Sequence, residues 1–595
     1  MESEWINKGE TKRLEGFSEM KTKTYMVEAG GFQNRGGWTL DTQFTVNMGS
    51  PYLIAHGTGN PVSDAKATFS VTEAGEYRLF AFTKNWVAGW APSYTPGVFT
   101  VTVNGREAGF RFGNNGVDWG WQYGGIVTLG ASENTIGLRD LSGFDGRCAT
   151  LLLTCDDTFV PPDDINAMTE LRRRLNDNTE DDDGGSFDLI VAGAGIAGIC
   201  TALSAARRGL RVALVQDREV VGGNNSSEVR VWLGGRTCFE PFPRVGSIVE
   251  ELEQRVMEHY GPANRAENYE DDKKLALLES EKNITLFLGH ILTACQVDNA
   301  RIKSVTVYNI ANNRYKRLTA PLYSDCTGDA TLGFEAGAHY EQTTNFHMGM
   351  SNWWCLEDTG KPQSFPLCPW AIDLRDCDFP GRKRTMPDKS REERARYLGC
   401  WFWEAGMETD AILSAEQARD TNLRAMYGAV DCLKNHDGDF GTYRLGGSCI
   451  IGGKRESRRL LGDVILTKAD VSNRVDYEDA CVPATWNFDV HYPDITYFGA
   501  FAKGGSFLTK AWYEKYKLPY FIPYRCLYSR NIGNLFMAGR NISVTHDALG
   551  ATRVMRTGGM MGEVNGAAAF LCAKYGCTPS EVYRKHLSEF VNEIR

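Results

Sequence analysis

The sequence predicts a multidomain protein in which an all-β part precedes an α/β part, and three observations carry this prediction. Short runs of β-branched and aromatic residues, separated by turn residues, fill residues 25–155. A glycine-rich turn between an apolar run and a run of small residues follows at 187–209. The chain has 595 residues, too many for a single hydrophobic core. We therefore expect an N-terminal antiparallel β-sandwich, then a Rossmann-like domain that carries an inserted α+β domain.

The β-sandwich is expected over residues 1–160, with strands such as ATFSVT, VFTVTVNG and ATLLLTC. The phrases TEAGEYRLFAFTKNW and FTVTVNG resemble accessory jelly-roll modules of carbohydrate-active proteins. Four tryptophans could form a platform that stacks on a sugar, but we favour a packing role for them. They are Trp86, Trp90, Trp119 and Trp121. Residues 161–185 are expected as a linker with one short helix, INAMTELRRRL, because the acidic run and paired glycines that follow disfavour packing.

Composition excludes several function classes. The hydrophobic content of 42% and charged content of 24% are those of a soluble globular protein. A net charge of −10 without a Lys/Arg run argues against a nucleic-acid surface. No apolar stretch approaches the roughly 18 residues that span a membrane, and the first residues lack the apolar core of a signal peptide. We expect a cytoplasmic protein, with the periplasm as the alternative if a signal peptide has been removed.

The sixteen cysteines predict neither a metal site nor a disulfide framework. None of them forms C-x-x-C, so zinc ribbons and iron–sulfur clusters are unsupported. We expect most of them to behave as small core residues in a reducing compartment. Cys148 and Cys155 are the pair that could join in an oxidising space, which we do not expect. The sequence leaves the oligomeric state open.

The glycine-rich turn has the pattern of a dinucleotide site. Gly193, Gly195 and Gly198 give GxGxxG between a predicted strand and a helix, with Ile196 and Ala197 in the same turn. The first glycine permits the tight turn, the second lets a pyrophosphate approach the backbone, and the third lets the helix pack on the strand. A strand at 210–215 completes the βαβ unit.

Later segments are predicted to return to the same sheet. An amphipathic helix is expected at 245–260, and strands at 283–295 and 301–310. The segment 318–338 is predicted as a strand that ends in the turn of Gly328 and Asp329. At 534–571, a short strand meets Gly539 and Arg540 and leads into a long helix of small residues from about 553.

Five motifs in this order, GAGIAG, GGNNSSEVRV, SDCTGDA, GGKRESRRLLGD and MAGRNISVTHDALGATRVM, resemble the FAD-dependent oxidoreductase family found in sugar-degrading bacteria, with the two-dinucleotide fold of glutathione reductase. The resemblance implies noncovalent FAD as the cofactor. It implies an FAD-binding domain made of residues 186–345 and 526–595, around a substrate or cap region at 346–525. A second strand-preceded GxGxxG is not evident, so the electron acceptor is unidentified.

Two positions depart from the family's pattern. Gln216 stands where an acidic residue usually binds a ribose, with Asp217 next to it. Arg540 replaces the usual acidic residue after the last glycine, which leaves Asp547 as the nearest candidate for the ribityl chain. The implied FAD contacts also include the loop after the second strand. They are Gly222, Gly223, Asn224, Asn225, Ser226, Ser227 and Glu228.

The segment 346–525 is rich in aromatic residues that could line a ring-binding pocket or fill a core. They are Trp353, Trp354, Trp370, Trp401, Trp403 and Trp486. Arg455, Arg458 and Arg459 lie around Glu456, and we favour salt bridges over substrate contact for them.

The leading hypothesis is an oxidoreductase in which a secondary alcohol of a carbohydrate or glycoside passes a hydride to flavin N5. A redox-neutral variant would cleave a glycosidic bond and return the hydride. Alternatives are a carbohydrate-binding protein with a structural flavin, and a dehydrogenase or reductase of a non-sugar organic acid. The chemistry needs a base with a pKa near neutrality. His546 is the first candidate, because it lies between the last predicted strand and the long helix, and His347 and His491 are its competitors.

Overall fold

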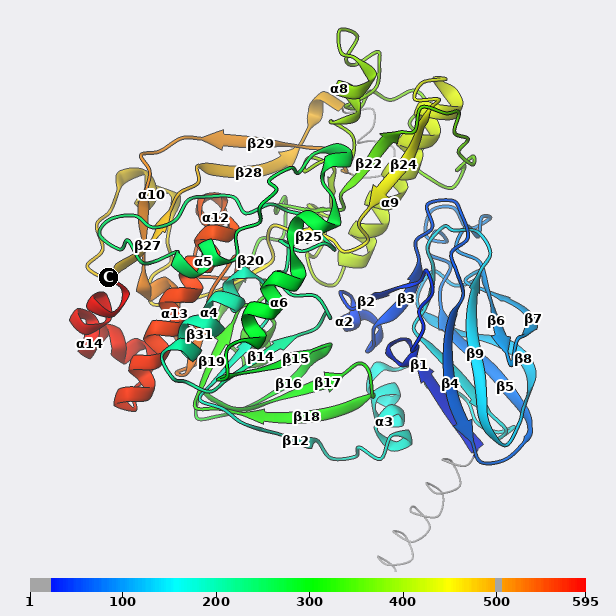
Figure 1. The fold of residues 1–595 in the computed structure, drawn as a ribbon, viewed down its shortest axis with the longest axis horizontal. Helices are drawn as coiled ribbons and strands as arrows, with labels where there is room; N and C mark the ends of the chain where they lie inside the picture. The colour runs from blue at the N-terminus through cyan, green and yellow to red at the C-terminus, as the bar shows by residue number, and fades with distance from the viewer. Residues whose placement is uncertain (1–22, 498–505) are drawn as a thin grey trace, which may run out of the picture. The chain divides into compact units, whose positions relative to one another are not determined.

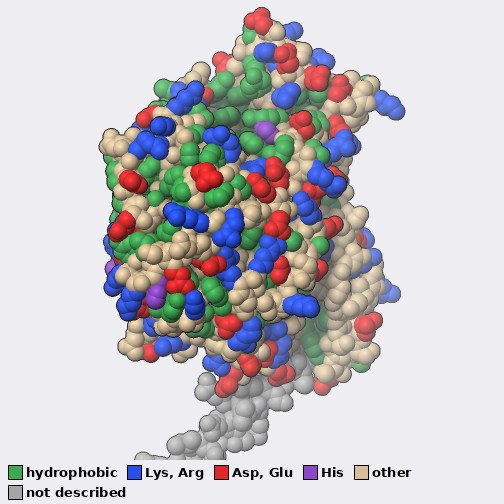
Figure 2. Space-filling model, turned by 60° about the vertical axis from the view of Figure 1, so that its left-hand side comes forward, with side chains coloured by type: hydrophobic (Ala, Val, Ile, Leu, Met, Phe, Trp, Pro, Cys, Tyr) green, Lys and Arg blue, Asp and Glu red, His purple; other side chains and the backbone are tan. Residues whose placement is uncertain are grey.

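The computed structural model describes residues 23–497 and 506–595 (Figure 1). The chain divides into two compact units. The first comprises the described residues up to Asp182 together with Asn309–Tyr315, and the second comprises Asp183–Tyr308 and the chain from Lys316 onward. On the face drawn in Figure 2, Lys and Arg side chains are interspersed with Asp and Glu side chains and form no extended field of one sign.

The first unit contains antiparallel sheets that share one core. One sheet has the order β1-β11-β5-β8 and another β4-β9-β6-β7. Their bounds are β1 Thr24–Glu28, β11 Thr150–Thr154, β5 Gly75–Thr83 and β8 Gly120–Leu129, then β4 Ala65–Val71, β9 Ser132–Asp140, β6 Phe99–Val103 and β7 Arg106–Phe112. Alternate residues of both sheets, among them Leu79, Leu153, Val101 and Leu138, belong to one hydrophobic cluster. Period-2 alternation therefore buries one face of each sheet.

A third sheet of the first unit has the order β10-β3-β2. It is made of β10 Gly146–Cys148, β3 Tyr52–Ala55 and β2 Thr39–Asp41. The predicted strand runs missed these three strands and β7, whose residues alternate poorly between buried and exposed. Period alone does not identify strands of three or four residues.

The short helix predicted between the domains is present as α3 (Ile165–Leu175). Its N-cap Asp164 accepts a hydrogen bond from the N–H of Ala167. Arg172 on its buried face lies 2.7 Å from Glu28 of β1, so the helix is tied to the sheet by a buried ion pair. The paired glycines after it, predicted as linker, are part of a strand, β12 (Asp182–Ser186).

A five-stranded parallel sheet is the centre of the second unit, in the order β15-β14-β13-β19-β31. The strands are β13 Leu189–Ala192, β14 Val212–Gln216, β15 Ile284–Leu288, β19 Leu322–Asp325 and β31 Leu535–Met537. These are the strands that the sequence predicted around the glycine turn, with shorter bounds. The residues of β13, β14, β19 and β31 are all buried, as expected of a parallel sheet covered on both faces, whereas the edge strand β15 is partly exposed.

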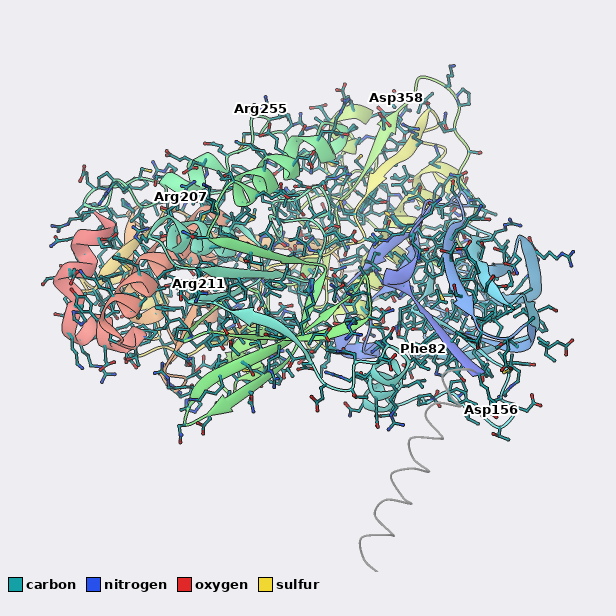
Figure 3. The ribbon with its side chains drawn as sticks, turned by 60° about the horizontal axis from the view of Figure 1, so that its bottom comes forward. Phe82, Asp156, Arg207, Arg211, Arg255 and Asp358 are labelled. Carbon is teal, nitrogen blue, oxygen red and sulfur yellow. The ribbon has the colours of Figure 1, made fainter. Side chains whose placement is uncertain are left out.

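Two helices pack against each other beside this sheet: α4 (Ile196–Arg207) and α13 (Met555–Tyr575). Glycines of α13 make the approach possible. A Cβ on Gly562 would lie 2.2 Å from the carbonyl oxygen of Ala197, and one on Gly566 would lie 2.5 Å from Cβ of Ser204. At the end of α4 lies Arg207, which is labelled in Figure 3. It pairs with Glu251 and Glu281 at 2.6 and 2.8 Å.

The helix predicted at 245–260 is wrong beyond its first turn, because α5 covers only Ser247–Glu251. Glu563 of α13 accepts the N–H groups of Gly246, Ile248 and Val249, which fixes the start of α5. Gln254 then turns inward, where it is 2% exposed and binds Asn225. This buried tertiary contact outweighs the amphipathic pattern of the segment.

Further strands and helices complete the second unit. β16 (His290–Asp298), β17 (Arg301–Asn309) and β18 (Arg314–Thr319) form a sheet with β12. The cap region consists of small sheets: β21 (Met350–Ser351) with β23 (Glu404–Ala405) and β25 (Gly453–Lys454), β22 (Trp354–Asp358) with β24 (Tyr443–Ser448), and β28 (Phe488–Pro493) with β29 (Thr509–Glu514). The helices include α6 (Asp271–Glu279), α9 (Ala415–Asp431), α12 (His546–Thr552) and α14 (Pro579–Ile594).

Candidate active site

The glycine turn has open space at its centre. Gly193 has a φ of 93°, a conformation that suits glycine, and Gly195 is the N-cap of α4 without a side-chain cap. A Cβ on Gly198 would lie 1.8 Å from the carbonyl oxygen of Gly193, so this glycine is required for the fold itself. A Cβ on Gly195 would meet only Cα of Gly223, at 3.8 Å. The structure therefore leaves room beside Gly195, at the positive end of the α4 dipole.

The loop after β14 lies against this turn. The N–H of Gly222 donates to the carbonyl of Ala194 at 2.8 Å, and Gly222 and Gly223 both have positive φ. Gln216 supports the turn, since its side-chain oxygen accepts the N–H of Ala194 at 2.7 Å. Asp217, next to it, is half-buried.

Side chains of this loop mainly hold the loop itself. Asn225 is fully buried and donates to the carbonyl of Val231, and Ser226 donates to that of Gly223. Asn224 reaches the carbonyl of Lys454 at 3.2 Å, and Glu228 pairs with Arg218 at 2.7 Å. Burial raises the pKa of Glu228. The N–H of Ser227 donates to Asp271. Gly222 and Gly223 therefore lie beside Gly195, while most polar side-chain atoms of the loop residues that follow bind protein partners.

The two later turns meet in an ion cluster. Asp329 lies 2.6 Å from Arg540 and 2.7 Å from Lys454, and Ser457 donates to it at 2.8 Å. Burial opposes ionisation of Asp329, but the two cations hold its pKa well below the ordinary value. Arg540, which departs from the family's pattern, thus has a structural partner. Gly328 has positive φ, and its Cβ position is 3.0 Å from Nε of Arg540.

Glycines also line the return from β31 into α13. Gly539 has a φ of 105°. A Cβ on Gly558 would lie 3.5 Å from Cα of Gly539 and 3.9 Å from Cβ of Ala197. The N-cap of α13, Val554, provides no side-chain cap. Two buried oxygens in this region have no protein partner, Oγ1 of Thr557 and Oδ1 of Asn541. This row of small residues, with an uncapped helix start and unsatisfied polar atoms, fits an extended dinucleotide with polar edges.

His546 is held by a buried carboxylate. It is the first residue of α12, and its Nδ1 lies 2.8 Å from Oε2 of Glu456. Glu456 also accepts hydrogen bonds from Arg459, Thr343 and the N–H of Met348. Burial would raise the pKa of Glu456, but His546 and Arg459 lower it to about 2.

The other ring nitrogen of His546, Nε2, has no hydrogen-bond or ion-pair partner among the residues that the structure describes. The side chain is 20% exposed, whereas that of Glu456 is fully buried. His546 thus has one nitrogen fixed by a carboxylate and one open. Tyr492 lies beside it, with ring centroids 6.3 Å apart. Asp547, the next residue of α12, together with burial raises the pKa of Tyr492.

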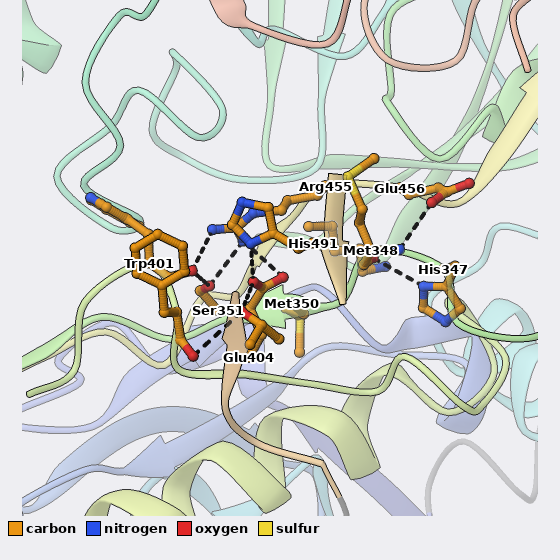
Figure 4. Close-up of polar contacts among 12 residues, drawn as sticks. His347, Met348, Met350, Ser351, Trp401, Glu404, Arg455, Glu456 and His491 are labelled. Atoms are coloured by element: carbon orange, nitrogen blue, oxygen red, sulfur yellow. Dashed lines mark hydrogen bonds and ion pairs between the residues drawn. The ribbon is translucent and has the colours of Figure 1, made fainter. Parts of the chain in front are cut away.

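His347 has neither nitrogen open. Its Nδ1 and Nε2 lie 3.0 and 2.8 Å from the carbonyl oxygens of Met348 and Thr409, and the residue is 3% exposed. The structure therefore places His347 in a buried structural position, although it lies in the same region as Glu456 (Figure 4).

His491 lies between two carboxylates. Its Nδ1 contacts Glu404 and its Nε2 lies 3.3 Å from Asp489. Burial would raise the pKa of Glu404, but Arg455 and His491 lower it to about 2, and the pKa of Asp489 is lowered well below its usual value by His491 and Arg553 despite burial. Figure 4 shows Glu404 pointing toward both His491 and Arg455. Both ring nitrogens of His491 are therefore occupied by carboxylate partners.

Salt bridges account for two of the three arginines in the cluster, so our interpretation of the sequence holds in part. Arg459 pairs with Glu456, and Arg455 lies 3.4 Å from Glu404. Arg458 stacks on the ring of Phe334 at 3.6 Å. Most of the cap tryptophans are core residues, since Trp353, Trp354, Trp370 and Trp403 are 5% exposed or less. Trp401 and Trp486 are half-buried.

Several residues that support the site were missed from the sequence. They are Lys274, Asp271, Gln254, Lys454 and Ser457. Lys274, Asp271 and Gln254 belong to no motif, Lys454 and Ser457 lie in GGKRESRRLLGD, and each acts through a contact between distant segments. The one available signal was KRESRR, whose Glu456 was recognised as an ion-pair partner but not as the partner of His546.

The sequence pattern of the family described as FAD dependent oxidoreductase matches residues 188–591. This chain belongs to that family. It is an FAD-dependent oxidoreductase. An oxidoreductase of this kind acts on a small-molecule substrate.

Curated relatives match only a short part of the chain. The glycerol-3-phosphate dehydrogenase of Mycobacterium leprae (strain TN) is 39% identical over 71 residues, which are 12% of this chain and 12% of that protein. The aerobic glycerol-3-phosphate dehydrogenase of Staphylococcus aureus (strain USA300) is 30% identical over 86 residues, 14% of this chain and 15% of that protein. The chain thus spans about an eighth of the length of the curated relatives it matches.

Similar solved structures are also flavoproteins. Mycobacterium smegmatis Sdh1 in its apo form has a TM-score of 0.29 at 13% identity, covering 66% of this chain and 69% of that one. The myxobacterial halogenase CndH, described as FAD-dependent, has a TM-score of 0.30 at 12% identity, covering 68% and 78%. The Bacillus halodurans glycerol-3-phosphate dehydrogenase complexed with FAD has a TM-score of 0.21 at 14% identity, covering 29% and 40%.

Two further observations bear on partners. In residues 23–497 and 506–595, no helix is both long and apolar enough to cross a bilayer. The same residues contain no group of three or more His, Cys, Asp or Glu side chains arranged to hold a metal ion. All sixteen cysteines, including Cys148 and Cys155, are free thiols.

Proposed function

We propose that this enzyme oxidises a secondary alcohol of a carbohydrate or glycoside, with His546 as the general base. The observation that carries the proposal is the state of the three candidate histidines. His347 has both nitrogens against carbonyls and His491 has both against carboxylates, whereas His546 has an open nitrogen. A general base needs such a nitrogen within reach of the proton that it removes.

The residues that would hold FAD are those of the glycine row and the uncapped helix starts: Gly193, Gly195, Gly198, Gly223, Gly539 and the first turn of α13. We propose that FAD is held noncovalently there. Bound FAD supplies the two-electron oxidation by accepting the hydrogen and electron pair of the carbinol C–H bond. The O–H proton of the same carbinol leaves to Nε2 of His546, so an alcohol becomes a ketone with atoms and charges balanced.

Glu456 prepares His546 for this proton transfer. Its ionised carboxylate accepts the Nδ1–H, which leaves Nε2 as the lone-pair nitrogen in the neutral ring. After the proton arrives, the same carboxylate stabilises the imidazolium at 2.8 Å. Arg459 and the N–H of Met348 keep the carboxylate ionised and in place.

A sugar or glycoside is supported by half-buried aromatic rings close to this region. Trp486 donates to Asp489 at 3.1 Å, and its ring contacts Trp232, which stacks on His259 at 4.9 Å. Such rings with polar edges suit a pyranose. The redox-neutral variant, cleavage of a glycosidic bond with return of the hydride, needs the same base. The N-terminal sheets would then form a β-sandwich accessory module, and the sixteen free thiols favour the cytoplasm.

A phosphorylated or carboxylated alcohol is the second candidate substrate. The half-buried Arg553 and Arg455 lie in the network around Glu404 and Asp489, and short segments match enzymes named for glycerol 3-phosphate. Arginine suits planar or tetrahedral anions. A flavin that is structural, in a protein that only binds carbohydrate, is the remaining alternative.

Anaerobic mixing of the purified holoenzyme with sugars, glycosides and polyol phosphates tests these candidates. The bleaching of flavin absorbance near 450 nm, roughly the band of oxidised flavins, should occur with a neutral sugar or glycoside. Bleaching by polyol phosphates or hydroxy acids alone would move the assignment to the second candidate. Binding of sugars without bleaching would indicate a binding protein. The His546→Ala holoenzyme is the control for reduction that does not use this site.

A further inference from the structure

The loop that faces Gly195 lies on a buried platform that no motif identifies. The platform consists of α6 and the residues just before it. Lys274 of α6 is fully buried, and its ammonium donates to the carbonyls of Asn225 and Tyr269 at 2.6 and 2.5 Å. A buried ammonium is costly unless its donors are satisfied, so its presence here needs a reason.

Asp271 holds the same loop two residues further on. Its Oδ2 accepts the N–H of Ser227 at 3.0 Å, while its Oδ1 lies 3.4 Å from the ammonium of Lys274. One ion pair on a single helix turn thus binds a carbonyl and an N–H of the loop. Burial lowers the pKa of Lys274, and Asp271 opposes that effect.

The end of the loop is fixed by the same platform. Tyr269 is fully buried, and its hydroxyl donates to the carbonyl of Arg230 and contacts Asn264. Arg230 has a φ of 67°, unusual for a residue with a side chain, and its guanidinium lies 4.8 Å above the ring of Trp353. The loop backbone is therefore held in a strained form by α6 and by the cap.

Lys274 is close to the glycines that leave space for the cofactor. A Cβ on Gly222 would lie 3.2 Å from Nζ of Lys274 and 2.3 Å from the carbonyl oxygen of Asn225. Gly223 in turn lies against Gly195. We propose that Lys274 is a positioning residue for FAD: its ammonium, with Asp271, holds the loop of residues 222–228 in the form that keeps the space beside Gly195 open.

The test compares Lys274→Met with Lys273→Met in the full-length protein. The second lysine is its neighbour on α6 and has a 46% exposed side chain, whose ammonium lies 3.9 Å from Glu270 and donates to the carbonyl of Glu253 at 2.8 Å. Loss of a buried charged donor is expected to raise the dissociation constant for FAD about 10- to 100-fold in Lys274→Met. We expect the bound-flavin spectrum to change in the same variant, and Lys273→Met to match the parent protein in both measurements.

A general loss of stability is distinguished by two additional measurements. The melting temperature is measured for each protein without FAD and after FAD is added. In Lys274→Met, the drop in the apo melting temperature should be no larger than the reduction of the rise that FAD causes, because the loop carries little of the core. Asp271→Asn, which keeps the shape of the helix turn, is expected to weaken FAD binding in the same direction if Lys274→Met proves insoluble. Unchanged FAD affinity and spectrum in a folded Lys274→Met protein, or in Asp271→Asn if only that variant folds, would overturn the proposal. Neither result depends on the substrate or on His546.

Discussion

Nδ1 of His546 lies 2.8 Å from Oε2 of Glu456, although the two residues are separated by 90 positions in the chain. β25 precedes Glu456, and α12 begins at His546 just after the return strand β31. The pair therefore joins the cap to the FAD-binding sheet. It combines a fixed nitrogen with an open one, which is the arrangement that a general base requires.

His546→Ala should retain FAD but melt at a lower temperature than the parent, because the buried Glu456 loses its histidine partner. Substrate-dependent flavin reduction should slow by about 10²- to 10⁴-fold, the range for loss of a general base. Stopped-flow measurement under anaerobic conditions checks this. Flavin reduction at the parent rate would exclude His546 as the base.

Glu456→Gln should reduce both the activity and the stability of the fold at neutral pH. The pKa of the carboxyl is lowered to about 2 from 4.5, so its ionised form stabilises the fold above about pH 4.5, and this contribution is lost as the pH falls toward 2. The contribution is on the order of 3 kcal/mol. Unfolding by urea between pH 3 and 7, roughly that window, should show a parent-minus-variant difference that grows with pH. A pH-independent difference would mean that the ion pairs of Glu456 are not responsible.

His491→Gln should mainly destabilise the protein. Removal of the imidazole takes one partner from Glu404 and one from Asp489 in a buried network, at a cost of about 3–5 kcal/mol. The free energy of unfolding should therefore fall by more than in His546→Ala, while any folded fraction keeps its flavin-reduction rate. A stable His491→Gln protein with a much slower rate would instead assign His491 to the chemistry.

Gly195→Ala and Gly198→Ala should fail in different ways. A Cβ at 195 meets no atom closer than 3.8 Å, so the apo fold should persist while FAD affinity drops by more than about tenfold. Gly195→Val should abolish binding. A Cβ at 198 lies 1.8 Å from a carbonyl oxygen, so Gly198→Ala should lower apo stability by about 1–3 kcal/mol. Titration calorimetry and thermal melts of the apo proteins separate the two effects.

Glu563 should make the protein less stable as the pH rises from about 4.5 to 7. Burial raises its pKa to about 7, although three N–H groups that start α5 oppose the shift. A raised carboxyl pKa favours the protonated folded state, so stability is greatest below the unfolded value of about 4.5 and is lost toward 7. In Glu563→Gln the free energy of unfolding should change less over this window. The parent should lose on the order of 3 kcal/mol more than the variant between these two pH values. Glu279→Gln, at an exposed position of α6, is the control and should leave the profile unchanged.

Local patterns predicted the central sheet well because they are governed by neighbours in the chain. The apolar run before Gly193, the turn and the small-residue helix were recognised, and the strands at 210–215, 283–295, 318–338 and 534–538 all enter one sheet. The FAD cofactor and the oxidoreductase class are confirmed by the family match. The roles of individual contact residues, the substrate and the domain boundaries remain predictions.

Predictions failed where a distant contact outweighed a local pattern. The segment 245–260 has a helical period, but Gln254 turns inward to Asn225 and ends α5 after five residues. The strand predicted at 283–295 is divided at Gly289 into β15 and β16, which belong to different sheets. Arg540 was taken as a departure from the family, and in the structure it is the ion-pair partner of Asp329.

The sequence by itself determined the turns and the order in which strands return to the sheet, since glycine spacing and apolar period act over a few residues. Tertiary structure alone decided which histidine keeps an open nitrogen. The sequence offers His347, His491 and His546 as candidates alike. Only the packing of distant segments places a carbonyl at each nitrogen of His347 and a carboxylate at each nitrogen of His491. The same holds for Lys274, whose buried ammonium is explained only by the carbonyl of Asn225, 49 positions away. Charge burial is a property of three-dimensional packing, because its cost depends on which donors and acceptors meet.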